Sequence, residues 1–210
     1  MLRIISIIII SYLLGSIPTA YIFGRFLKGI DIRKFGSGNV GATNAFRVLG
    51  RGWGITILAL DILKGFLPVI ILGNIFTKQL DLAQAQNIFI AIGLGCICGH
   101  NWTIFLGFKG GKGVATTLGV LSALALKIPG LSIVLGLTIL IWFTSFFIVR
   151  IISLSSLLAA ISFPLFTILF RQSSVVILLG TLLAIFVILR HKSNIKRLLE
   201  GKESRLSFRK

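Results

Sequence analysis

The chain contains 210 residues, of which 56% are hydrophobic and only 13% are charged. A soluble domain carries about 25% charged residues, so this composition excludes a water-soluble globular protein. The 22 lysine and arginine residues face only 5 aspartate and glutamate residues, which leaves few carboxylates for Mg²⁺ sites or paired acid–base catalysis. We therefore expect an integral membrane protein in which residues 1–210 form a single polytopic domain.

The apolar segments predict an all-α fold. A helix needs about 20 largely apolar residues to cross a bilayer, and seven segments meet or approach this length. The fourth and the sixth are short for a complete crossing. We expect transmembrane helices at residues 2–24, 53–73, 86–106, 113–128, 130–149, 153–170 and 174–190.

The basic residues predict the orientation of these seven helices. Seventeen of them lie in the C-terminal tail and in the connections that follow the first, third and fifth helices. The opposite side holds four, namely Arg3, Lys78, Lys127 and Arg171. Because lysine and arginine are enriched in cytoplasmic loops, we expect the N-terminus outside and the C-terminus in the cytoplasm.

The first polar segment, residues 36–47, reads GSGNVGATNAFR. Its glycines allow the backbone to approach a ligand closely. Ser37, Asn39, Thr43 and Asn44 supply neutral hydrogen-bonding groups, and Arg47 adds a planar cation that suits phosphate. The alternative is an ordinary turn between two helices.

The second segment contains Gly99-His100-Asn101-Trp102 and then the glycine-rich loop 109–113, KGGKG. A glycine-rich loop that leads into a helix N-terminus is a typical anion site, and two lysines add positive charge. The P-loop of nucleotide hydrolases is not matched, because Gly113 follows Lys112 where that motif requires Ser or Thr. The alternative is a short loop whose lysines only follow the charge bias of cytoplasmic connections.

The third segment runs from Arg190 to Glu203. His191 and Asn194 are three residues apart and would share one face of a helix. By itself, such a segment is most often a basic tail that interacts with lipid headgroups.

Asp61 and Lys64 lie inside the second predicted helix, three residues apart on one face. Ionisable residues within a membrane are costly and are functional candidates. A structural ion pair is an equally good interpretation.

Together, residues 36–47, 99–101 with 109–113, and His191 with Asn194 resemble the three signature motifs of the bacterial acyl-phosphate:glycerol-3-phosphate acyltransferases, the PlsY family. The Asp61-x-x-Lys64-Gly65 pattern and residues 15–18, GSIP, also fit. The resemblance extends from the first predicted helix to Glu203.

This resemblance implies a seven-helix enzyme of the bacterial inner (plasma) membrane whose active site faces the cytoplasm. It would transfer a fatty acyl group from acyl-phosphate to the sn-1 hydroxyl of glycerol 3-phosphate, giving lysophosphatidic acid and phosphate in phospholipid biosynthesis. Because acyl-phosphate is already activated, no cofactor is expected, and no metal site is expected either. The expected partners are the two substrates and membrane lipid, without nucleic acid; the oligomeric state is left open.

With this resemblance, we expect Ser37, His191 and Lys112 to be the catalytic residues. Arg47, Lys112 and Asn194 would bind phosphate, while Ser37 and His191 would orient the acceptor hydroxyl or its phosphate. The general base is not identified, and a phosphate oxygen of the donor could take the proton. The other expected binding residues are Gly38, Asn39, Thr43, Asn44, Lys109, Gly110, Gly111 and Gly113.

Two other functions are weighed against this one. A CDP-alcohol phosphotransferase needs a carboxylate cluster for metal, which five scattered acids do not favour. An organic-anion transporter would place its binding groups near the bilayer midplane, whereas the polar segments here gather on one side. An acyl-CoA enzyme with an H-x-x-x-x-D pair is also disfavoured, because Phe105 and Lys196 stand five residues after His100 and His191.

Overall fold

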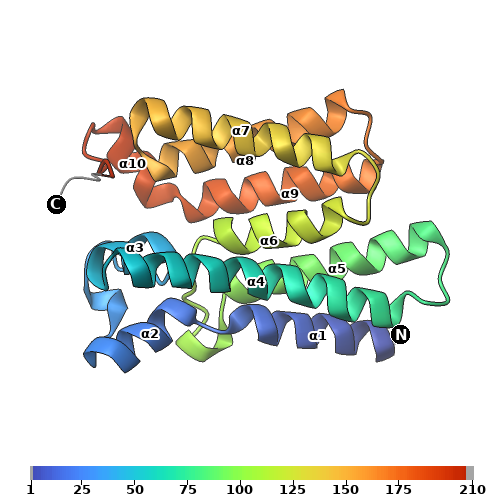
Figure 1. Ribbon diagram of the computed structural model, residues 1–210, viewed down its shortest axis with the longest axis horizontal. Coiled ribbons are helices and arrows are strands. Elements are labelled where there is room, and N and C mark those ends of the chain that lie inside the picture. Colours follow the sequence, from blue (N-terminus) through green and yellow to red (C-terminus); the bar gives the residue numbers. More distant parts are fainter. Residues whose placement is uncertain (1, 207–210) are drawn as a thin grey trace. The chain divides into compact units, whose positions relative to one another are not determined.

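The computed structural model describes residues 2–206, and all the regular elements in this range are helices (Figure 1). The chain divides into two compact units, residues 1–127 and 128–210. The first two predicted motifs lie in the N-terminal unit, and the third lies in the C-terminal unit.

The N-terminal unit is built around four apolar helices. Helix α1 packs against α5, and α4 packs against α5 and α6. Short elements on one side of α4 carry the first polar segment. In chain order the elements are α1 (Leu2–Ser16), α2 (Thr19–Lys28), the 3-10 helix η1 (Ile32–Lys34), α3 (Ala42–Val48), α4 (Arg51–Phe76), α5 (Leu82–Asn101), the 3-10 helix η2 (Ile104–Leu106) and α6 (Val114–Ala125).

Glycines bring these helices close together. A Cβ added at Gly99 of α5 would overlap the carbonyl oxygen of Tyr12 in α1. One added at Gly119 of α6 would overlap the carbonyl oxygen of Ile62 in α4. Small residues at helix contacts are typical of membrane proteins, in which packing rather than water exclusion holds helices together.

A hydrophobic cluster includes two residues of the first polar segment, Val40 and Ala45. It joins side chains of α2, η1, α3, α4 and η2, and the residues with the least exposure include Ile32 and Ile57. Its buried members are Ala20, Ile32, Val40, Ala45, Leu49, Ile57 and Leu106. The segment 36–47 therefore rests on a packed core.

The C-terminal unit contains α7 (Leu131–Val149), α8 (Ile152–Leu169), α9 (Ser174–Arg190) and α10 (Lys192–Leu199). Helix α8 packs against both α7 and α9. The chain bends by 64° between α9 and α10. This bend lies at His191, the first residue of the third predicted motif.

The helices confirm an all-helical membrane protein but differ in detail from the seven predicted spans. In the described range, five helical segments are long and apolar enough to cross a membrane, and a sixth is added if α9 and α10 count as one bent span. Helix α6 has 12 residues, or about 18 Å at 1.5 Å per residue, which is short for a crossing. The first predicted helix is broken before Pro18, because proline lacks the amide hydrogen that would continue the helix.

Candidate functional site

Asn44 organises the first polar segment from its interior. Its Oδ1 atom accepts a hydrogen bond of 2.8 Å from the amide of Ser37. Its Nδ2 group donates to the carbonyl oxygens of Ile32 and Phe35, at 3.2 and 3.0 Å. Since Asn44 is completely buried, these bonds identify a residue that shapes the loop, whereas the sequence had suggested a ligand contact.

The same geometry explains why glycine occurs at two positions of this segment. Gly36 and Gly38 have positive φ angles of 60° and 71°, a conformation that favours glycine. A Cβ on Gly36 would overlap the Oδ1 atom of Asn44. The loop thus presents Ser37 and Gly38 on its exposed surface, and Arg47 is exposed at the end of α3.

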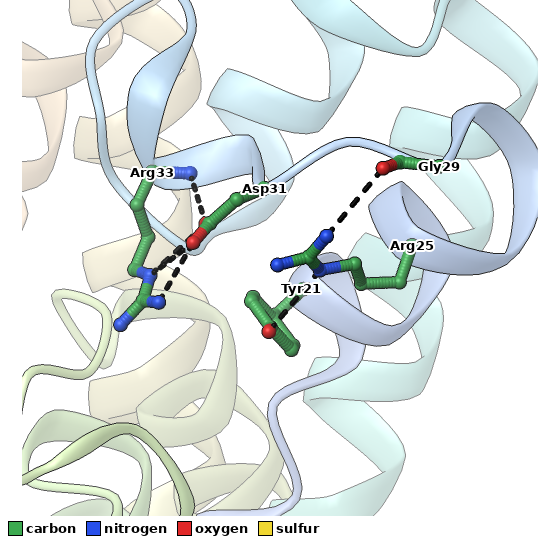
Figure 2. A network of polar contacts seen from close by, with 5 residues as sticks. All are labelled: Tyr21, Arg25, Gly29, Asp31 and Arg33. Atoms are coloured by element: carbon green, nitrogen blue, oxygen red, sulfur yellow. Dashed lines mark hydrogen bonds and ion pairs between the residues drawn. The ribbon is translucent and has the colours of Figure 1, made fainter.

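Residues 21–33, which precede this loop in the sequence, form a polar network (Figure 2). Arg33 forms an ion pair of 2.7 Å with Asp31, and its guanidinium lies 5.2 Å from the ring centre of Tyr21. Arg25 donates to the Tyr21 hydroxyl at 3.2 Å and lies over the same ring. The hydrogen bond from Arg33 lowers the pKa of Asp31 to about 2. This carboxylate therefore stays charged and is engaged with Arg33.

The glycine-rich loop 109–113 folds back onto the end of α5. The amide of Gly110 donates to the carbonyl of Asn101 at 3.2 Å, and that of Gly111 donates to the carbonyl of His100 at 3.0 Å. These two amides thus hold the loop in place. The groups that could bind an anion here are the side chains of Lys109 and Lys112 and the first-turn amides of α6, which have no hydrogen-bond partner within their own helix.

Gly113 completes the turn into α6. Its φ angle is 77°, and a Cβ at this position would be within 2.5 Å of the Oδ1 atom of Asn101. Glycine is therefore required both by the backbone conformation and by the contact with α5. Lys112 immediately before it is partly buried, and Lys109 is exposed.

Asp61 and Lys64 form the ion pair that their spacing suggested, with 2.8 Å between Lys64 Nζ and Asp61 Oδ1. The same carboxylate oxygen accepts a hydrogen bond of 2.6 Å from Thr19. Lys64 also donates to the carbonyl of Ile17 at 2.8 Å, just where α1 ends. The pair therefore ties α4 to the break between α1 and α2.

In the C-terminal unit, His191 is buried at the bend between α9 and α10. Its Nδ1 atom lies 2.7 Å from the carbonyl oxygen of Val187. Because a carbonyl can only accept, Nδ1 carries the hydrogen of this bond. The imidazole is thus held in one orientation.

The carboxylate of Glu203 accepts hydrogen bonds from three side chains of the same unit. Asn194 donates to its Oε1 atom at 2.6 Å, Ser153 donates to Oε1 at 2.8 Å, and Arg197 donates to Oε2 at 2.6 Å. Partial burial raises the pKa of Glu203, but the hydrogen bonds from Arg197, Asn194 and Ser153 outweigh it and lower the pKa overall.

The sequence did not reveal the roles of Glu203, Ser153 and Thr19. Glu203 could have been suspected because it is one of 5 acidic residues and lies in a basic tail. No local pattern points to Ser153 or Thr19, whose partners are 50 and 42 residues away. In residues 2–206, no three His, Cys, Asp or Glu side chains are arranged to hold a metal ion.

The sequence profile of the glycerol-3-phosphate acyltransferase family matches residues 5–201. The chain is 42% identical over 209 residues to the glycerol-3-phosphate acyltransferase of Desulforudis audaxviator, covering 100% of this chain and 98% of that protein. It is 39% identical over 201 residues to the enzyme of the same name from Fusobacterium nucleatum, covering 96% and 97% of the two chains.

Two solved structures are similar over nearly the whole chain. Both are crystal structures of PlsY, an integral membrane glycerol 3-phosphate acyltransferase, and both are 38% identical to this chain in sequence. The glycerol 3-phosphate form has a TM-score of 0.84 and covers 97% of this chain and 96% of its own. The lysophosphatidic acid form has a TM-score of 0.81, with 97% and 95% covered.

Proposed function

The chain belongs to the glycerol-3-phosphate acyltransferase family, and we propose that its acyl donor is acyl-phosphate. The enzyme would transfer the fatty acyl group to the sn-1 hydroxyl of glycerol 3-phosphate and release lysophosphatidic acid and inorganic phosphate. The related PlsY structures with glycerol 3-phosphate and lysophosphatidic acid support this acceptor and this product.

The observation that carries the proposal is the loop 109–113, which places two lysines at the N-terminus of α6. Cationic side chains and first-turn amides together favour a phosphate group. Arg47, at the end of the first polar segment, supplies a further cation in a second motif, which suits a reaction with two phosphate-bearing substrates. Neither histidine has an aspartate five residues later, so the H-x-x-x-x-D arrangement of the common acyl-CoA enzymes is absent from the sequence.

We assign the binding of substrate phosphate to Arg47, Lys112 and Asn194. Ser37 and His191 orient the acceptor hydroxyl or its phosphate, and Ser37 lies on the exposed rim of its loop. Asn44 and the amides of Gly110 and Gly111 shape the binding loops. The residues that line them are Gly38, Asn39, Thr43, Lys109 and Gly113.

The reaction itself requires no nucleotide. The sn-1 oxygen of glycerol 3-phosphate attacks the acyl carbonyl carbon, and a carbon–oxygen ester bond forms. The bond between that carbon and the phosphate oxygen breaks, and phosphate leaves with the electron pair. The hydroxyl proton passes to a phosphate oxygen of the donor. Cations that hold the phosphate groups stabilise the negative charge that develops on the leaving group.

We also propose that the protein has seven spans in the bacterial inner membrane, with its active site facing the cytoplasm. The short helix α6 would be the fourth span and the bent pair α9–α10 the seventh, and the five longer helical segments would be the others. The family match across residues 5–201 supports one acyltransferase domain formed from both units. The charge bias of the connections supports a cytoplasmic C-terminus, and a reporter fused after Lys78 should then read as external.

The donor is tested with purified enzyme and glycerol 3-phosphate. Palmitoyl-phosphate should support formation of lysophosphatidic acid with stoichiometric release of phosphate, and palmitoyl-CoA should not. Comparable rates with the two donors would contradict the proposed donor while leaving the acceptor intact.

A further inference from the structure

A buried charged cluster surrounds Asp61, in the middle of the apolar helix α4. The residue is 1% exposed, yet it carries the ion pair with Lys64 and the hydrogen bond from Thr19. A pair of charges inside a membrane helix is costly and marks a functional position by default. Both charges belong to the Asp61-x-x-Lys64-Gly65 pattern, but neither has been given a role in the reaction.

His100 lies between Asp61 and the glycine-rich loop. Its Nδ1 atom is 3.8 Å from Asp61 Oδ1. On the other edge of the ring, a Cβ added at Gly111 would overlap Nε2. The main chain of His100 also accepts the hydrogen bond from the amide of Gly111. The placement of His100 therefore determines where Gly111 can lie.

The cluster is not arranged for stability alone. Within the described chain, buried side-chain atoms without a hydrogen-bond partner include Asp61 Oδ2, both amide atoms of Asn101, and Thr116 Oγ1. Such groups lower stability. Asn101 contacts Gly113, and Thr116 lies in the first turn of α6. These polar groups lie beside the loop 109–113 and lower the stability of the protein. Their presence therefore points to a role in the function of that loop.

We propose that Asp61 is a positioning residue of the acyltransferase. Through His100 it holds the loop 109–113 in the geometry that presents Lys112 to a substrate phosphate. Asp61 itself does not touch the reacting atoms. This inference rests on the phosphate-binding role proposed for the loop.

The test compares steady-state kinetics of Asp61→Asn and Lys112→Met, each purified in detergent. Lys112→Met identifies which of the two phosphate substrates the loop holds, because the KM for that substrate should rise. Asp61→Asn should raise the KM for the same substrate by about tenfold or more, since a small displacement of a binding group is enough, and change kcat less. Asp81→Asn is the matched control: Asp81 caps α5 through the amide of Gln84, and asparagine caps equally well.

The outcomes separate the two proposals. If Lys112→Met leaves both KM values unchanged, the phosphate role of the loop is wrong, and the positioning role fails with it. If Lys112→Met raises a KM but Asp61→Asn does not, only the role of Asp61 is overturned.

A second variant distinguishes a specific effect on KM from a general loss of stability. Asp61→Asn leaves the ammonium of Lys64 buried and uncompensated, whereas Asp61→Asn/Lys64→Met removes both charges. The double variant should regain the melting temperature of the wild type while its KM stays raised. Recovery of KM together with the melting temperature would mean that only the lone charge mattered, and would overturn the proposal.

A double-mutant cycle tests whether Asp61 acts through His100. In a His100→Phe background, Asp61→Asn should change the same KM by less than about twofold, because the ring that transmits the contact has lost its nitrogens. Independent, multiplicative effects of the two substitutions would show that Asp61 does not act through His100.

Discussion

The side-chain amide of Asn194 and the carboxylate of Glu203 are joined by a hydrogen bond of 2.6 Å. Asn194 belongs to the third predicted motif, while Glu203 comes from the tail that follows α10. The amide of Leu206 also donates to the carbonyl of Arg150 at 2.8 Å, so the tail is attached to the C-terminal unit at two points.

Replacement of Glu203 should destabilise this unit. Glu203→Gln weakens the bond to Arg197 and reduces the acceptor strength towards Asn194 and Ser153, and hydrogen bonds to a charged group contribute about 1.5–3 kcal/mol. A fall in melting temperature of about 2–4 °C per kcal/mol is expected for a chain of this size. Glu200→Gln is the control, because its ion pairs are exposed and worth about 0–1 kcal/mol. Equal melting temperatures for the two variants would contradict the role of Glu203.

The contribution of Glu203 should also depend on pH. Its pKa in the folded protein is lowered, so its stabilising effect is complete above the unfolded pKa of about 4.3. The effect is lost as the pH falls through the lower, folded pKa. The difference in melting temperature between wild type and Glu203→Gln should therefore stay constant from about pH 7 to 5 and shrink below about pH 4. A difference that vanishes already near neutral pH would rule this explanation out.

The two asparagines of the first polar segment should behave differently. Asn44→Ala leaves the carbonyls of Ile32 and Phe35 and the amide of Ser37 unpaired, at about 1–3 kcal/mol for each buried group. Both the melting temperature and kcat/KM should fall. Asn39→Ala, at a half-buried position of the same loop, should lower kcat/KM without lowering the melting temperature. Thermal unfolding of the two purified variants checks this, and an unchanged melting temperature for Asn44→Ala would refute its loop-shaping role.

Arg47 and Lys112 should be the strongest phosphate ligands. Truncation of either to alanine should cost about 1.5–3 kcal/mol per charge-assisted bond, or roughly a tenfold to more than hundredfold loss in kcat/KM. Lys112→Arg should also be poor, because the guanidinium is larger and planar. Lys78→Ala, outside both motifs, provides the control. Steady-state kinetics within threefold of the wild type for both truncations would exclude them as ligands.

His191 should orient the acceptor and should not be the sole general base. Its Nδ1 group is engaged with the Val187 carbonyl, and the described contacts of Glu203 are with Asn194, Ser153 and Arg197. We expect His191→Asn to retain partial activity and mainly to raise the KM for glycerol 3-phosphate. A sole base would instead cost about 10²–10⁴ in kcat. A thousandfold lower kcat with unchanged KM would show that His191 acts as the base.

The sequence by itself determined the membrane character, the positions of the apolar helices and the Asp61–Lys64 pair. These features depend on composition and on neighbours three or four residues apart, which a helix always brings together. The motif residues could likewise be found, because glycine, asparagine and basic residues are grouped locally in residues 36–47 and 109–113.

Tertiary structure decided what the motif residues do. Asn44 was expected to bind substrate, and only the tertiary structure reveals its hydrogen bonds to the carbonyls of Ile32 and Phe35, which hold the loop. Gly110 and Gly111 were expected among the binding residues, and only the tertiary structure reveals that their amides donate to the carbonyls of Asn101 and His100 in α5. Glu203 meets Ser153 across 50 residues of sequence. Hydrogen-bond partners at such separations are set by which helices pack together, and no local pattern of residues specifies that.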